Sequence, residues 1–186
     1  MGRFKLINTF IKDLKVIEVE PFNDDRGYFY ESYNENDFKN MGIADHFVQD
    51  NQSRSVKGVL RGLHFQINHP QVKLVRCIEG EVFDVAVDLR KGSETFGKYY
   101  GLILSEANKK MFYIPKNFAH GFLVLSDYAT FSYKVDDFYH PNDEGGIIYN
   151  DIDINIDWGI QPGFNIILSE KDKKNQTLKE YIENLK

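Results

Sequence analysis

Short stretches of alternating apolar and polar residues, separated by turn residues, dominate this chain. In residues 81–90, EVFDVAVDLR, apolar side chains occupy every second position, at Phe83, Val85, Val87 and Leu89. This period of two is typical of a half-buried β-strand. Further strand candidates are YYGLIL (99–104), KMFYIP (110–115), HGFLVL (120–125) and TFSYKV (130–135). Many short strands with turns between them predict an all-β sandwich or barrel, here a jelly roll.

Helices are expected only at the periphery. The segment 34–42, NENDFKNMG, predicts a short helix capped by Asn34 or Asn36 and ended by Gly42. In 177–186, TLKEYIENLK, apolar residues at spacings of three, four and seven predict an amphipathic helix. We find no internal repeat and no linker, so residues 1–186 are expected to form a single domain with a helical C-terminal segment from about residue 169.

Composition excludes several classes of protein. With 186 residues, 42% of them hydrophobic, the chain can bury enough surface to fold as a globular domain. Its net charge of −5 disfavours general nucleic-acid binding, which depends on Lys and Arg contacts to phosphate. No apolar run has the length of a signal peptide core or a membrane span, so we expect a cytoplasmic protein with no membrane partner. Cys77, the single cysteine, lies among apolar residues and is interpreted as a small hydrophobe rather than a nucleophile.

The five histidines raise the question of a metal ion. His64 and His69 are five residues apart, and Pro70 is expected to end their strand. That spacing differs from the tight His-x-His pair of metal-binding jelly rolls. We therefore predict no metal site, and a metal-dependent cupin oxygenase is the least favoured interpretation.

The stretch VLRGLHFQ (59–66) combines a strand-like apolar pattern with a cation, an imidazole and an amide. Simple alternation puts His64 and Gln66 on one face of the strand and Arg61 on the other. If Arg61 and His64 contact one ligand, the strand must twist or bulge near Gly62. On its own, His64 is as compatible with a structural histidine as with a functional one.

Several other segments place polar groups at strand edges. A closed barrel would bring such groups together on its interior, which favours a site over a set of unrelated solvated edges. The candidates are Arg26 and Glu31 in DDRGYFYE, Gln49, Asp50 and Asn51 in QDNQSRS, Lys73 in PQVKLVR, and His120 in IPKNFAHGF.

Two further segments have both a structural and a functional interpretation. Tyr133 and Tyr139 are compatible with core tyrosines whose hydroxyl groups stay hydrated, or with a proton donor and a stacking ring. Ser169 and Asp172 resemble a capping box at a helix start, although Asp172 can cap and still face a histidine.

The ordered set of motifs resembles one enzyme family. DDRGYFYE, FVQDNQSRS, GVLRGLHFQ, PQVKLVRCIEGEVFDVAVDLRKGS, FYIPKNFAHGFLVL, YKVDDFYHPNDEGGIIYND and INIDWG follow one another from about residue 5 to about residue 175. In this order they are similar to the dTDP-4-dehydrorhamnose 3,5-epimerases. The resemblance implies a cupin-like jelly roll, a homodimer, no cofactor, and a thymidine-diphosphate (dTDP) linked 4-keto sugar as substrate.

The resemblance also implies roles for single residues. His64 matches the general base, Asp172 the carboxylate that orients it, Tyr133 the proton donor, and Lys73 the lysine near the carbonyl oxygen of the substrate. Tyr139 matches the ring that stacks on thymine. The implied ligand-binding positions are Arg26, Glu31, Gln49, Asn51, Arg61, His120, Glu144 and Lys171. Relatives that invert one carbon or act on another nucleotide sugar, and a jelly roll that only binds a nucleotide sugar, stay as alternatives.

Overall fold

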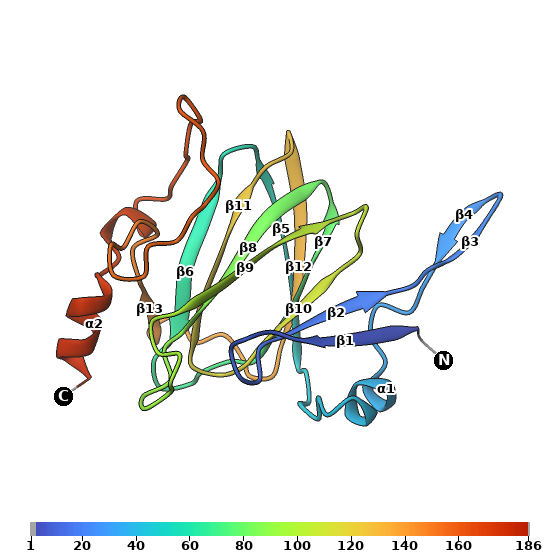
Figure 1. Ribbon diagram of the computed structural model, residues 1–186, viewed down its shortest axis with the longest axis horizontal. Coiled ribbons are helices and arrows are strands. Elements are labelled where there is room, and N and C mark those ends of the chain that lie inside the picture. The colour runs from blue at the N-terminus through green and yellow to red at the C-terminus, as the bar shows by residue number, and fades with distance from the viewer. Residues whose placement is uncertain (1–2, 186) are drawn as a thin grey trace.

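The protein is built from two antiparallel sheets that face each other (Figure 1). The computed structural model describes residues 3–185. The six-stranded sheet has the order β1 (Phe4–Asn8), β2 (Lys15–Val19), β10 (Met111–Ile114), β7 (Lys73–Glu79), β12 (Tyr128–Val135) and β5 (Gln49–Val56). The five-stranded sheet has the order β13 (Glu144–Gly146), β6 (Leu60–Gln66), β11 (Phe118–Val124), β8 (Glu81–Asp88) and β9 (Tyr99–Ser105). The predicted jelly-roll fold is confirmed.

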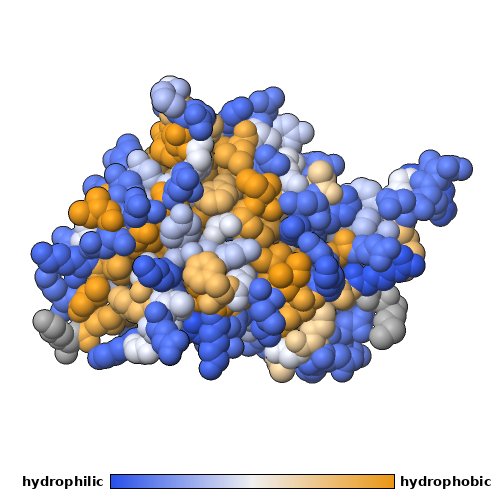
Figure 2. Space-filling model, in the orientation of Figure 1, coloured by the Kyte–Doolittle hydropathy of each residue, from blue (hydrophilic) through white to orange (hydrophobic). Residues whose placement is uncertain are grey.

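A separate hairpin extends from this body. It consists of β3 (Phe22–Asp24) and β4 (Gly27–Phe29), which pair only with each other. Figure 1 shows it pointing away from the barrel, at the end opposite to the C-terminal segment. Viewed from the same side in Figure 2, the tip of this hairpin is hydrophilic, whereas apolar residues gather over the body.

The main core fills the space between the sheets. Phe112 and Phe131 from the six-stranded sheet meet Val82, Leu104 and Phe122 from the five-stranded sheet, all 5% exposed or less. Cys77 belongs to the same cluster, and burial raises the pKa of its thiol to about 12. It is therefore a core hydrophobe, as the sequence indicates.

Strand β8 is buried on both faces, so the prediction of a half-buried strand is wrong there. Asp84 and Asp88 are fully buried, although their alternation with apolar residues suggested a solvent-facing side. The reason is a second layer. The C-terminal segment crosses the outer face of the five-stranded sheet, where Trp158 and Leu178 pack with Val85 and related residues. The outer side chains of β8 thus contact this layer, and its inner side chains enter the barrel.

The turn at Glu79-Gly80 links β7 to β8, but these strands lie in different sheets. This turn therefore forms a corner of the barrel. Gly80 has a φ of +75°, and an added Cβ would lie 2.1 Å from the carbonyl oxygen of Tyr128. Only glycine fits this corner.

Both predicted helices are present and capped. In α1 (Glu35–Asn40) the side-chain oxygen of Asn34 accepts the backbone N–H groups of Asn36 and Asp37, so Asn34 is the cap. In α2 (Leu178–Asn184) Thr177 and Glu180 form a reciprocal capping box. A short 3₁₀ helix, η1 (Asp172–Lys174), precedes α2. No helix within residues 3–185 is long and apolar enough to cross a membrane.

Removal of the Trp158 side chain tests the importance of the outer layer. Trp158 is 6% exposed, packs edge-on against Phe83, and donates its indole N–H to the carbonyl oxygen of Tyr149 at 2.9 Å. We expect Trp158→Ala to lower the free energy of unfolding by about 3–5 kcal/mol, in the range for large core truncations. Urea unfolding followed by circular dichroism measures this, because the variant lacks the only tryptophan of the chain.

Ile152→Ala is the control, since Ile152 is 88% exposed in the same segment. It should change the free energy of unfolding by less than about 0.5 kcal/mol. Equal effects of the two substitutions would show that the segment is not a packed layer.

Candidate active site

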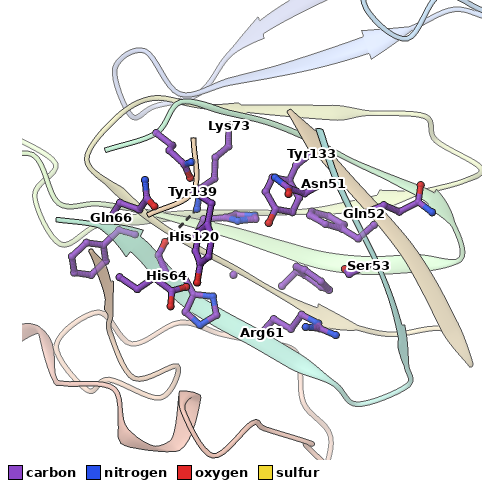
Figure 3. Close-up of a pocket in the computed structure, with 16 residues that line it drawn as sticks. Asn51, Gln52, Ser53, Arg61, His64, Gln66, Lys73, His120, Tyr133 and Tyr139 are labelled. Atoms are coloured by element: carbon purple, nitrogen blue, oxygen red, sulfur yellow. Dashed lines mark hydrogen bonds between the residues drawn. The ribbon is translucent and has the colours of Figure 1, made fainter. Parts of the chain in front are cut away.

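A pocket of about 310 Å³ lies between the two sheets. Strands β5, β7 and β12 line it from one side, and β6 and β11 line it from the other. Figure 3 shows Arg61 and His64 on β6, with Asn51 and Tyr133 across the pocket from them. The barrel therefore brings together side chains that are far apart in the sequence.

Strand β6 carries an irregularity at Gly62. His64 pairs with His120, whereas Arg61 pairs with Phe122, so β6 has one residue more than β11 in this interval. The extra residue is a β-bulge, and it reverses the alternation of faces. Arg61 and His64 consequently line the same pocket. The bulge predicted near Gly62 is confirmed.

The site tolerates only glycine at this bulge. Gly62 has a φ of +129°, and an added Cβ would lie 2.5 Å from the Cα of Gly121 on β11. The two strands therefore come into contact at a pair of glycines. This close approach keeps β6 and β11 paired on both sides of the bulge.

His64 forms a close pair with a carboxylate from the C-terminal segment. Its Nε2 lies 2.5 Å from Oδ1 of Asp172, which is 3% exposed. The hydroxyl of Ser169 donates to the other carboxylate oxygen at 2.8 Å. Burial opposes ionisation of Asp172, but these hydrogen bonds outweigh it and lower its pKa. An ionised carboxylate can only accept, so Nε2 of His64 carries the hydrogen and Nδ1 keeps its lone pair.

Lys73 and a buried histidine–carboxylate pair occupy another wall of the pocket. Asp84 is fully buried, and both of its oxygens lie 3.0 Å from Nε2 of His120. Burial lowers the pKa of His120 and raises that of Asp84, which moves both groups toward their neutral forms. Loss of hydration lowers the pKa of Lys73 to about 8, although the carboxylates of Asp84 and Glu144 oppose the shift.

Tyr133 faces the pocket from β12, the strand that pairs with β5 and β7. Burial raises the pKa of its hydroxyl, although the charge of Arg61 acts in the opposite direction. The hydroxyl therefore stays protonated at neutral pH. It can donate a proton from the side of the pocket opposite to His64.

The rim of the pocket carries an aromatic ring and an ion pair. Tyr139 is 49% exposed, and Glu144 forms an ion pair with Lys171 beside it. Gln49 lies behind the rim: its amide donates to Asn51 at 2.9 Å and accepts the backbone N–H of Tyr139 at 3.3 Å. The rim thus offers a flat ring and polar groups to a ligand.

Comparison with known proteins identifies the family. The family model described as dTDP-4-dehydrorhamnose 3,5-epimerase matches residues 8–180. The enzyme of that name from Escherichia coli is 54% identical over 179 residues, covering 95% of this chain and 96% of its own. The one from Methanothermobacter thermautotrophicus is 51% identical over 180 residues and 97% of each chain.

The chain belongs to the dTDP-4-dehydrorhamnose 3,5-epimerase family. A solved member, the Legionella pneumophila dTDP-6-deoxy-D-glucose-3,5-epimerase in complex with dTDP-4-keto-L-rhamnose, superposes with a TM-score of 0.92 at 52% identity. The superposition covers 95% of this chain and 94% of that one. The resemblance read from the motifs is confirmed.

Most residues that the family resemblance assigns to the site are brought together. Those that line the pocket are Asn51, Arg61, His64, Lys73, His120, Tyr133, Tyr139 and Glu144. Asp172, Lys171 and Gln49 contact these residues from behind. Their individual roles stay predictions.

Three predicted residues lie elsewhere. Asp50 points to the opposite face of β5, where it accepts from Lys134 at 2.9 Å, so it does not line this pocket and its role in ligand binding stays a prediction. Strand alternation explains its position, because its neighbours Gln49 and Asn51 face the site. Arg26 sits on the projecting hairpin and pairs with Asp24, and Glu31 follows that hairpin. Neither lines the pocket of its own chain.

Other pocket residues were missed by the sequence analysis. Asp84 was assigned to a solvent-facing side because nothing in the alternation reveals the second layer. Gln66 and Gln71 also line the pocket. For Gln66 a signal existed, since it shares a strand face with His64. In the described part of the chain, no three His, Cys, Asp or Glu side chains are placed to hold a metal ion together.

Gly62→Ala tests the bulge. Adding a methyl group there combines an unfavourable positive φ with a clash against the backbone of Gly121. We expect a loss of roughly 3 kcal/mol or more in the free energy of unfolding, at the upper end of the cost of such strain. Gly92→Ala is the matched control, because Gly92 has a φ of +80° and nothing within 4 Å of an added Cβ.

The control should cost about 1 kcal/mol, the strain alone. Thermal or urea unfolding of both variants measures the difference. If Gly62→Ala is no worse than Gly92→Ala, the close contact of β6 with β11 does not limit the fold.

Proposed function

We propose that this protein inverts carbons 3 and 5 of dTDP-4-dehydro-6-deoxy-D-glucose and yields dTDP-4-dehydro-L-rhamnose. The observation that carries the proposal is the placement of a base and an acid on opposite walls of one pocket. The His64–Asp172 pair stands on the side of β6, and Tyr133 stands on the side of β12. Inversion requires a proton to leave one face of a carbon and another to arrive at the opposite face.

His64 takes the proton. A hydrogen on a carbon next to a ketone is acidic because the electron pair of the C–H bond moves into an enolate, with its charge on oxygen. A neutral imidazole has a reference pKa of about 6.5, which suits this transfer near neutral pH. Asp172 holds the ring through Nε2 and stabilises the imidazolium that forms, as in other histidine–carboxylate pairs.

Lys73 and Tyr133 complete the step. The ammonium group of Lys73 stabilises the enolate oxygen, and one such donor contributes about 3–4 kcal/mol in comparable sites. Tyr133 then gives its hydroxyl proton to the opposite face of the carbon, and the ketone re-forms. The phenolate regains a proton from solvent, and the imidazolium of His64 releases its proton to solvent, which restores both groups. The substrate already carries its ketone, so the reaction involves no net oxidation and needs no redox cofactor.

The diphosphate and the base of the nucleotide also find partners. Arg61 supplies a cation inside the pocket of an otherwise acidic protein. Tyr139 offers a half-exposed ring at the rim on which thymine can stack. The Legionella pneumophila relative is solved with dTDP-4-keto-L-rhamnose, which supports this class of ligand.

Deuterium exchange tests the chemistry directly. Incubation with dTDP-4-dehydro-6-deoxy-D-glucose in deuterium oxide should replace the hydrogens on carbons 3 and 5, as followed by NMR. Exchange at a single carbon would indicate a mono-epimerase, and binding without exchange would indicate a nucleotide-sugar binding protein.

His64→Ala should slow exchange at both carbons at least 100-fold, since general-base catalysis contributes about 10²–10⁴-fold.

The pH dependence tests Lys73. Because its pKa is lowered to about 8, the cation is present below that pH and is lost above it. We expect kcat/KM to fall about tenfold per pH unit above pH 8, since this parameter reports the free enzyme. Lys73→Arg cannot lose its charge in this range, so the variant should be less active but should lack the alkaline decline. A decline that persists in Lys73→Arg belongs to another group.

We also propose that the protein acts as a homodimer. The projecting hairpin exposes Phe22, Tyr28 and Phe29 to 47%, 52% and 69%. A second copy would cover these rings. Arg26 and Glu31 lie outside the pocket of their own chain, and in a dimer they would contribute to the pocket of the second copy.

Sedimentation velocity measures the oligomeric state. The protein should sediment as a dimer, and Phe29→Glu should shift it toward monomer and weaken activity. Ile152→Glu, at a side chain that is 88% exposed and far along the chain, serves as the control. A monomer of full activity would rule out a role for the second copy.

A further inference from the structure

The loop that carries Tyr139 is held by a second loop rather than by the core. We call residues 136–143, between β12 and β13, the Tyr139 loop, and residues 67–72, between β6 and β7, the facing loop. Tyr139 and its neighbour Phe138 are 49% and 60% exposed. Packing of these rings therefore does little to hold the Tyr139 loop, and its position depends on polar contacts along its backbone.

One buried amide spans both loops. Gln66 is 7% exposed. Its Nε2 donates to the carbonyl oxygen of His69 in the facing loop at 2.7 Å. Its Oε1 accepts the backbone N–H of His140 in the Tyr139 loop at 2.8 Å. His140 directly follows Tyr139, so this hydrogen bond acts one residue from the ring at the rim.

Further contacts join the two loops on either side of this amide. The carboxylate of Asp143 accepts the backbone N–H groups of Asn68 and His69 and also contacts Nδ1 of His69 at 3.0 Å. Burial opposes its ionisation, yet these hydrogen bonds lower the pKa of Asp143 to about 2. The rings of His69 and His140 stack with centroids 3.9 Å apart. Gln71 donates to the carbonyl oxygen of Asp137 at 2.8 Å.

We propose that Gln66 is a positioning residue that sets the place of Tyr139, and thereby the affinity of the pocket for the base of the nucleotide. The inference rests on the proposed function, in which Tyr139 stacks on a flat base. Gln66 acts through the backbone of the Tyr139 loop. Its hydrogen bonds to Phe138 and His140 fix the spacing between that loop and the strand that carries His64.

The chemistry of this position demands an amide. The side chain faces the carbonyl oxygens of His69 and Phe138, at 2.7 and 3.5 Å from its Nε2, and the N–H group of His140, and glutamine supplies the matching donor and acceptor. A methionine of similar length supplies neither. An ionised glutamate keeps the acceptor but turns an oxygen toward the carbonyl of His69, whereas a protonated glutamate restores the donor.

A double-mutant cycle separates action through Tyr139 from direct contact with the ligand. The measurement is the dissociation constant of dTDP by titration calorimetry. Tyr139→Ala should weaken binding about tenfold or more, in line with base–aromatic stacking. Gln66→Met should weaken it about fivefold, and the double variant should bind no more than about twofold worse than Tyr139→Ala, because coupled residues are not additive. Gln161→Met, at an exposed glutamine, is the control and should bind normally.

Each outcome has a distinct meaning. Fully additive effects would overturn the positioning role, because Gln66 would then act without Tyr139. If Tyr139→Ala binds dTDP as well as the parent protein, the stacking contact in the proposed function is wrong and the inference falls with it. Normal binding by Gln66→Met overturns the inference alone.

Gln66→Glu gives a second test, because one variant is compared with itself at two pH values. Burial and the carboxylates of Asp137, Asp143 and Glu144 around this position should raise the pKa of a glutamate placed here. Relative to the parent protein at each pH, dTDP binding should be weak at pH 8 and recover at least threefold at pH 6. Gln66→Met keeps the nearby His69, His140, Lys73 and Lys171 unchanged, so its ratio to the parent should not change with pH. A flat ratio for Gln66→Glu would overturn the proposal.

Discussion

The single extra residue in β6 is the constraint on which the site depends. A regular strand would direct Arg61 and His64 to opposite faces, one into the barrel and one into the outer layer. The bulge at Gly62 turns both toward the pocket while β6 stays paired with β11 and β13 on either side. The bulge also restricts the residue type at this position to glycine, because the two strands meet there at Gly62 and Gly121. Geometry that serves the chemistry therefore determines which residues the fold can accept.

The C-terminal segment links the stability of the barrel to the chemistry of the pocket. Its apolar side chains cover the outer face of the five-stranded sheet, and β8 becomes buried on both sides. The same segment carries Asp172 to His64 and holds it with Ser169. The side chain of Asn175 also reaches the carbonyl oxygen of Gly62 at 3.4 Å. A loosened outer layer would thus also release the carboxylate that orients the base.

Local patterns in the sequence predicted most of the elements, because alternation and capping are decided by near neighbours. The strands at 81–90 and 130–135, the cap at Asn34 and the amphipathic helix near the C-terminus are of this kind. Asp84 and Asp50 show the limit. Asp84 alternates with apolar residues and Asp50 lies in an entirely polar run, yet Asp84 is fully buried and Asp50 is exposed. Which face of a strand is buried depends on segments more than fifty residues away in the sequence. The local alternation of residues gives no information about those segments.

The pocket holds its charges in unequal environments, and this inequality suits proton transfer. Asp172 is stabilised as a carboxylate by its hydrogen bonds, while burial pushes Asp84 toward its neutral form. Lys73 lies between these extremes, because loss of hydration lowers its pKa to about 8. A fully hydrated ammonium would be a weaker partner for an enolate oxygen, because water would screen it and would have to be displaced. The low pKa of Lys73 is the cost of that desolvation. The barrel core that buries Lys73 and the nearby carboxylate of Glu144, which favours its charged form, are therefore parts of one arrangement.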